Sequence, residues 1–194
     1  MKITKNYEGL VRIENGDYVL NGDLISPDII EIDLDDRFVV NGKIDTTKSI
    51  ISNVTLIAGY GIKAGEGIEA GEGIEAGEGI KAGEGIKAGW GIEAGEGIEA
   101  GEGIEAGEGI KAGEGIEAGE GIEAKTFIQV ENRIFAGVSV YHNSENCDKT
   151  IKCAELRKGE IAYGELIIEE QVIEMTVAEI KAKLGIKNLK IKED

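Results

Sequence analysis

Apolar residues recur at every sixth position across the middle of the chain. From 61 to 124 the sequence repeats Gly-Ile-Glu/Lys-Ala-Gly-Glu, so each Ile precedes an Ala by two residues with a charged residue between them. Positions within a hexad are counted from its Ile, so the charged residue is second, Ala is third, and Gly, Glu and Gly follow as fourth, fifth and sixth. In an extended strand the first and third of these side chains share one face, and the second points to water. Two glycines per hexad argue against a helix, because each costs about 1 kcal/mol relative to Ala there. The pattern predicts three-residue strands joined by Gly-Glu-Gly turns, whose glycines are suited to positive φ.

A strand this short cannot bury its Ile alone, so the repeat predicts coils stacked into a β-solenoid. The six-residue spacing continues into degenerate hexads on both sides, back to Ile32 and forward to Val140. Counted in sixes between those two residues, there are 19 hexads. We therefore expect an all-β, hexapeptide-repeat solenoid (β-helix) over 32–145, with the degenerate outer hexads closing the stack.

The number of hexads in one coil has two readings. The hexads 50–55 and 134–139 resemble those of left-handed hexapeptide β-helices, with an aliphatic first residue and Asn or Gly in fourth place. That resemblance implies three hexads in an 18-residue coil, although the glutamates at the fifth position of the middle hexads depart from it. The charges favour two hexads, because Lys63 then faces Glu75 and opposite charges alternate at every step. Both coil sizes stay open, with a slight preference for three.

The flanking segments lack the regular hexad. We expect residues 1–31 to form an N-terminal β cap, because alternating segments surround the turn pair Asn15-Gly16. Residues 146–175 predict a β-hairpin around 157–159. Thr176 and Glu179 form a capping box, which predicts a short helix followed by a basic strand. The chain is thus divided into a cap (1–31), a solenoid (32–145), a hairpin region (146–175) and a helix-strand tail (176–194).

The composition is strongly acidic. The chain of 194 residues has 38 Asp and Glu against 21 Lys and Arg, a formal net charge of −17. Such a surface disfavours direct binding to nucleic acid or to an anionic membrane. No apolar run is long enough to span a bilayer, and the N-terminus lacks the apolar stretch of a signal peptide. We expect a cytoplasmic protein, in which homo-oligomers remain possible.

Little in the sequence indicates catalysis. His142 is the only histidine, and it falls on the last hexad, where an inward apolar residue is usual. The glycines alternate with acids, which disfavours a phosphate-binding loop. Cys147 and Cys153 match no zinc motif, and their redox state is open. We predict no enzyme, no cofactor and no metal ligand set.

The candidate binding residues are the glutamates at the fifth position of the hexads, with one tryptophan that interrupts them. They are solvated corners, a divalent cation site, or an acidic face that a protein recognises. Trp90 is either an anchor for a partner or a cover for a tail strand. The set is Glu66, Glu72, Glu78, Glu84, Trp90, Glu96, Glu102, Glu108, Glu114 and Glu120.

The order of β cap, Gly-rich hexads and basic tail resembles uncharacterised phage and prophage solenoid proteins, which implies a host cytoplasm. The first functional hypothesis is an acidic inhibitor that mimics nucleic acid. It would occupy the basic groove of a nucleic-acid-handling defence protein of the host. The second is a structural or assembly protein in which the solenoid is a rigid spacer.

Overall fold

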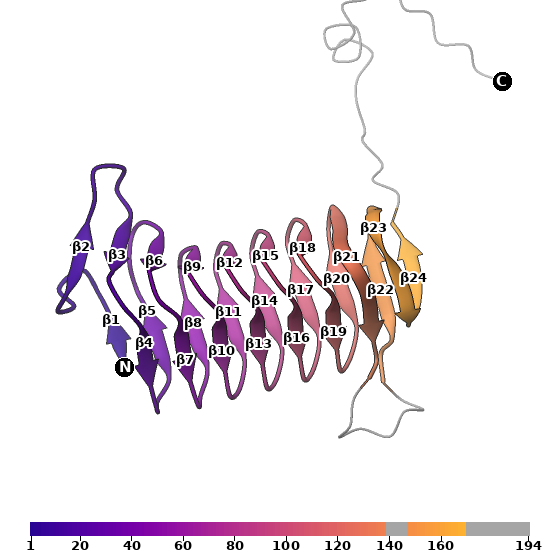
Figure 1. Ribbon diagram of the computed structural model, residues 1–194, viewed down its shortest axis with the longest axis horizontal. Coiled ribbons are helices and arrows are strands. Elements are labelled where there is room, and N and C mark those ends of the chain that lie inside the picture. The colour runs from indigo at the N-terminus through magenta and orange to yellow at the C-terminus, as the bar shows by residue number, and fades with distance from the viewer. Residues whose placement is uncertain (139–146, 170–194) are drawn as a thin grey trace, which may run out of the picture.

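The computed structural model describes residues 1–138 and 147–169, and all regular elements within those ranges are β-strands. The strands form coils that stack in one row from β1 to β24 (Figure 1). Between neighbouring coils of the stack the strands pair in parallel. The all-β solenoid predicted from the hexads is therefore confirmed.

Three ladders of paired strands run along the rod. The first ladder contains β1 (Lys2–Ile3), β5 (Ile30–Ile32), β8 (Ile50–Ser52), β11 (Ile68–Ala70), β14 (Ile86–Ala88), β17 (Ile104–Ala106), β20 (Ile122–Ala124), β22 (Thr150–Cys153) and β24 (Glu165–Ile168). The second contains β2 (Leu10–Arg12), β3 (Tyr18–Leu20), β6 (Phe38–Val40), β9 (Leu56–Ala58), β12 (Ile74–Ala76), β15 (Ile92–Ala94) and β18 (Ile110–Ala112). The third contains β4 (Leu24–Ser26), β7 (Ile44–Thr46), β10 (Ile62–Ala64), β13 (Ile80–Ala82), β16 (Ile98–Ala100) and β19 (Ile116–Ala118). The long β21 (Phe127–Ala136) joins the second and third ladders, and β23 (Glu155–Tyr163) pairs with β21.

One coil of the regular repeat holds three hexads. Ile62 lies opposite Ile80, and Ile68 lies opposite Ile86, so residues 18 apart are neighbours on adjacent coils. A 12-residue coil is excluded, and the alternation of opposite charges that favoured it does not occur in space. Lys63, for example, faces Asp45 and Lys81. The charge pattern favoured the wrong coil size because opposite charges alternate every 12 residues along the chain, whereas neighbouring coils are 18 residues apart.

The first and third residues of each three-residue strand of the regular repeat fill the core. Ile62 and Ala64 are buried to 1% and 2% exposure, and this pattern continues to Ile122 and Ala124. The charged residue between them is exposed throughout. The result is one continuous apolar column of Ile and Ala inside the rod, which no single coil could enclose.

The stacking begins within the segment predicted as a cap. Ile30 lies opposite Ile50, and Leu24 lies opposite Ile44, so the coils here are slightly longer than those of the regular repeat. The corner between β5 and β6 spans 33–37 and is two residues longer than the corners of the repeat. Counting back in sixes therefore placed Ile32 at the start of a strand, whereas it ends β5.

The N-terminal turn prediction is confirmed. β2 pairs antiparallel with β3, and Gly16 between them adopts a φ of 99°. Tyr7 and Leu10 pack against the end of the core. Two hydrogen bonds of 2.9 Å from the Arg37 guanidinium to the buried carboxylate of Asp17 tie this hairpin to the next coil.

The predicted hairpin in 146–175 is wrong for its described part. β22 and β24 are parallel neighbours, and β23 runs parallel to β21, so these strands continue the coils. Residues 157–159 lie inside β23 rather than in a turn. Gly159 has a φ of +126° and marks an irregularity in that strand, which is why its sequence looked like a turn.

The last hexads also differ from the prediction. Ile151 occupies the place opposite Ile122, where counting in sixes expected Val140. Val140 and His142 lie outside the described residues, as does the predicted helix-strand tail at 176–194.

The glycines of the regular repeat do not adopt positive φ, contrary to the expectation from their turns. Within the described residues, positive φ occurs only at glycines outside the repeat, such as Gly16 and Gly137. The glycine that follows each Ala of the repeat serves a close approach between coils. A Cβ on Gly101, for example, would overlap the carbonyl oxygen of Gly83 on the preceding coil. The fourth position of the hexad is therefore limited to glycine by space.

Candidate binding surface at the glutamate corners

The fifth-position residues lie at the corners of the coils, where they form three columns rather than one face. Each column runs along the rod with one member on each coil. Backbone hydrogen bonds join its members, as from the Glu96 amide to the Glu78 carbonyl at 3.3 Å. The Glu66 column contains Glu66, Glu84, Glu102 and Glu120. The Glu72 column contains Glu72, Trp90 and Glu108. The Glu78 column contains Glu78, Glu96 and Glu114.

The columns differ in how far their carboxylates reach water. Glu66, Glu72 and Glu120 are half-buried, and the other six glutamates of the set are exposed. The Glu78 column is the one whose glutamates are all exposed. Successive coils of a parallel stack are about 4.8 Å apart, so the Glu66 and Glu78 columns are lines of closely spaced negative charges, whereas Trp90 separates the two glutamates of the Glu72 column.

Two of the half-buried glutamates are bound by the coil before the regular repeat. Glu66 accepts hydrogen bonds from Lys48 at 2.8 Å and Ser49 at 3.0 Å, and these contacts lower its pKa, with Lys48 as the larger cause. Glu72 accepts bonds from the Thr55 amide at 3.1 Å and the Thr55 hydroxyl at 2.9 Å. These two carboxylates therefore have a structural role at the start of the repeat.

The second-position charges on the flat sides partly neutralise each other. Lys87 pairs with Glu105 at 2.8 Å, and Lys111 pairs with Glu93 at 2.5 Å. Lys81 pairs in the same way with Glu99 on the following coil. All four lysines of the repeat stand on these sides, while the corners carry only glutamates and Trp90. Most of the net negative charge of the repeat therefore lies along the corners, where Lys48 pairs with Glu66.

Trp90 takes the middle place of the Glu72 column, and its side chain is 52% exposed. Trp90 and Phe127 line the same shallow depression, of about 320 Å³. Arg157 stacks over the Phe127 ring, with its guanidinium carbon 3.7 Å from the ring centroid. A flat aromatic surface between carboxylates is chemically suited to a cationic side chain. Its contact with the predicted tail strand lies outside the described residues.

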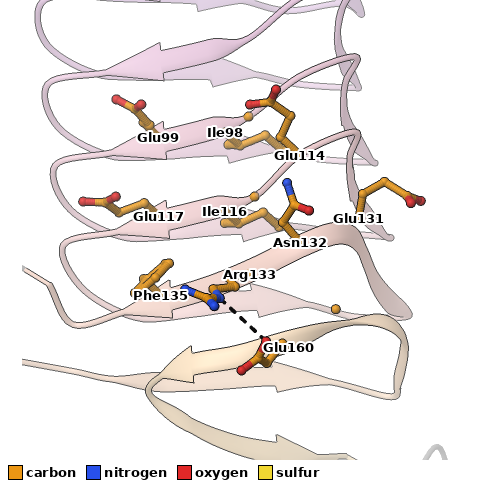
Figure 2. A pocket seen from close by; sticks show the side chains of 13 residues that line it. Ile98, Glu99, Glu114, Ile116, Glu117, Glu131, Asn132, Arg133, Phe135 and Glu160 are labelled. Carbon is orange, nitrogen blue, oxygen red and sulfur yellow. Dashed lines mark ion pairs between the residues drawn. The ribbon is translucent and has the colours of Figure 1, made fainter.

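A depression with a volume of about 770 Å³ lies on the third ladder beside the Glu78 column. Figure 2 shows Glu99 and Glu117 one above the other on successive coils, with Glu114 above Asn132 at the corner. Arg133 and Glu160 pair at 3.6 Å at its lower edge. Sequence reasoning missed this place, because only the 18-residue coil brings these residues together.

The chemistry of the described residues is otherwise limited. They contain no cluster of three or more His, Cys, Asp or Glu side chains placed to hold a metal ion. Cys147 is half-buried and Cys153 is buried, both as free thiols, and burial raises the pKa of Cys153. Among the same residues there is no helix with the length and apolar character that crossing a membrane requires.

The fold and these corners define the class of protein as a parallel β-solenoid with three strands per coil and acidic edges. No protein-family model, curated protein or solved structure matches the chain. The phage origin implied by the resemblance of its sequence stays a prediction.

Proposed function

We propose that the chain is a non-catalytic acidic binding protein whose glutamate corners engage a basic protein. The partner class is a nucleic-acid-handling protein, whose basic groove the rod occupies in place of nucleic acid. A phage-encoded inhibitor of a host defence protein, acting in the host cytoplasm, is the specific form of this proposal. The observation that carries it is the segregation of charge, with the four lysines of the repeat on the sides and only glutamates and Trp90 at its corners.

The density of charge supports this choice. Residues 61–124 contain 16 Glu and 4 Lys, a net charge of −12. At 18 residues per coil these 64 residues make about 3.6 coils, or about 17 Å of rod. The rod therefore carries one net negative charge per about 1.4 Å, close to the one per about 1.7 Å of duplex DNA. A basic groove shaped for a charged rod meets a similar field on this protein.

The alternative is a structural role, in which the solenoid is a rigid spacer and its ends make the contacts. The continuous core from Ile3 to Ile151 supports it, because a rod with one unbroken column resists bending. A spacer, however, gives no reason to place the four lysines of the repeat on its sides and none at its corners. We therefore rank it second.

The test is capture of proteins from a bacterial lysate on the immobilised chain, followed by competition with duplex DNA. Under the proposal the captured proteins bind nucleic acid, and added duplex DNA displaces them. Release also rises steeply between about 50 and 200 mM salt, as for DNA itself. Captured proteins that duplex DNA cannot displace contradict mimicry and favour the structural role.

A further inference from the structure

The last strands of the described chain form the end of the rod opposite the N-terminus (Figure 1), and core positions are exposed there. Leu166 of β24 lies opposite the fully buried Ile151, and Ile168 lies opposite Cys153, so both occupy inward core positions. Leu166 is nevertheless 36% exposed and Ile168 is 49% exposed. Leu156 and Ile161 of β23 are only half-buried against the same core. We call Leu156, Ile161, Leu166 and Ile168 the open end.

The other end of the rod is covered. Ile3 of β1 and Leu24 of β4 end the first and third ladders there, and their exposures are 0% and 2%. Tyr7 and Leu10 pack against that end of the core. Equivalent core positions are therefore sealed at one end and open at the other within the described residues.

Within 1–138 and 147–169, the open end also presents sheet edges. β24 ends the nine-stranded sheet, and all four of its residues are exposed. An edge strand with free amides and carbonyls is a template for pairing with another segment. Apolar side chains and backbone groups at this end both require a partner.

The chain itself supplies a segment at this place. The amide of Glu169 donates a hydrogen bond of 2.9 Å to the Cys153 carbonyl, so the chain leaves the last coil directly at the open end. The segment 170–194 follows, and it is longer than one coil of three hexads. A short tether gives such a segment an effective concentration of about millimolar. Its large apolar residues are Val172, Ile173, Met175, Val177, Ile180, Leu184, Ile186, Leu189 and Ile191.

Charge favours this segment over a second copy of the chain. Residues 170–194 contain five lysines, all between 181 and 192, and five acidic residues, so the segment is neutral overall on a chain whose formal net charge is −17. A neutral segment with a lysine-rich part is not repelled by an acidic rod, whereas two whole chains of that charge repel each other. We propose that residues 170–194 bind the open end, with their apolar side chains covering Leu166 and Ile168.

Hydrogen exchange on the full chain tests this directly. Residues 170–194 should be protected in the unaltered protein, and Leu166→Asp should lower that protection by about tenfold or more. Ile167→Asp is the matched control. Ile167 lies opposite Lys152 and is 37% exposed, but it points away from the core. Absence of protection in the unaltered chain, or equal losses in the two variants, overturns the proposal.

A reciprocal pair of variants covers the case in which Leu166→Asp unfolds the last coil. Leu189→Asp should lower the protection of the β24 amides, and Asn188→Asp should leave it unchanged. Equal effects of these two substitutions would also contradict the proposal. Sedimentation of the unaltered chain should give a monomer. A dimer that Leu166→Asp dissociates, with 170–194 unprotected, would show that a second copy covers the end instead.

Discussion

Lys63 of β10 lies directly opposite Lys81 of β13, with like charges facing each other on adjacent coils. This register fixes the coil at three hexads. It also determines which charged residues face each other elsewhere on the flat sides. Lys63 has a compensating neighbour in Asp45 on its other side, and Lys81 has one in Glu99. The sides therefore tolerate some like pairs, because each row also contains opposite ones.

Glu117 is the clearest place to relieve a like-charge pair. It faces Glu99 on one side and the uncharged Phe135 on the other. Replacing it with Lys should raise the free energy of unfolding by about 0.2–1 kcal/mol, because a cross-strand repulsion becomes an attraction. Denaturant unfolding measures the change, with Glu117→Gln expected to give an intermediate gain. A loss of stability in Glu117→Lys would contradict the register.

Gly101 should tolerate no side chain. Gly101→Ala places a Cβ against the carbonyl oxygen of Gly83, so we expect a loss of about 1–3 kcal/mol in the free energy of unfolding. Gly97, in the sixth position, is the control, because a Cβ there would be 3.5 Å from the Gly115 oxygen, an ordinary contact. Equal thermal stability of Gly101→Ala and Gly97→Ala would show that the coils approach less closely.

Acid should loosen the N-terminal coil through Asp35. Lys5 and Tyr18 contact its carboxylate at 2.6 and 2.7 Å and lower its pKa to about 2, with Lys5 as the larger cause. A lowered native pKa gives stability above the unfolded value of about 3.9, and this is lost as pH falls toward 2. Melting temperature should therefore decline over that window.

The matched variant for this effect is Asp35→Asn, which removes the titrating group. It should melt at a lower temperature than the unaltered chain near pH 5 and lose less on going to pH 2. Glu14→Gln, at an exposed carboxylate between β2 and β3, should follow the unaltered chain. An identical acid decline in Asp35→Asn would assign the effect to other groups.

The hexad period was sufficient to predict the solenoid and its core, because each Ile-x-Ala has a single way to bury two side chains. The period could not locate Ile32 or Ile151 correctly. Residues 33–37 add two residues at one corner, and a longer segment precedes β22. Insertions at corners leave the core unchanged, so the pattern of apolar residues carries little trace of them.

The sequence allowed the candidate residues to be chosen by type, but it did not show how they are arranged. Glu96, Glu102 and Glu108 belong to three successive hexads, and their regular spacing suggested one acidic face. In the folded chain they belong to three different columns, because a coil has three corners. The flat-side ion pairs were equally hidden, since Lys111 meets Glu93 only once the coil length is known.

The geometry of the columns makes the binding proposal quantitative. Changing Glu78, Glu96 and Glu114 to Lys reverses one exposed column, and changing Glu84, Glu102 and Glu120 reverses most of another. Changing Glu96, Glu102 and Glu108 to Lys changes the net charge by the same amount, but it takes one residue from each column. All three variants leave the buried Ile and Ala residues untouched, so circular dichroism should report an intact rod.

The most direct measurement uses a protein that the chain captures and that duplex DNA displaces. It is the salt dependence of the affinity between the chain and that protein. Each contact between opposite charges contributes about 0.9 to the slope of log affinity against log salt. For the column that the partner binds, the column variant should lower that slope by about 3, and the scattered variant should lower it by about 1. Equal slopes in the unaltered chain and all three variants would contradict binding through the glutamate corners. An affinity that does not change with salt concentration would contradict it as well.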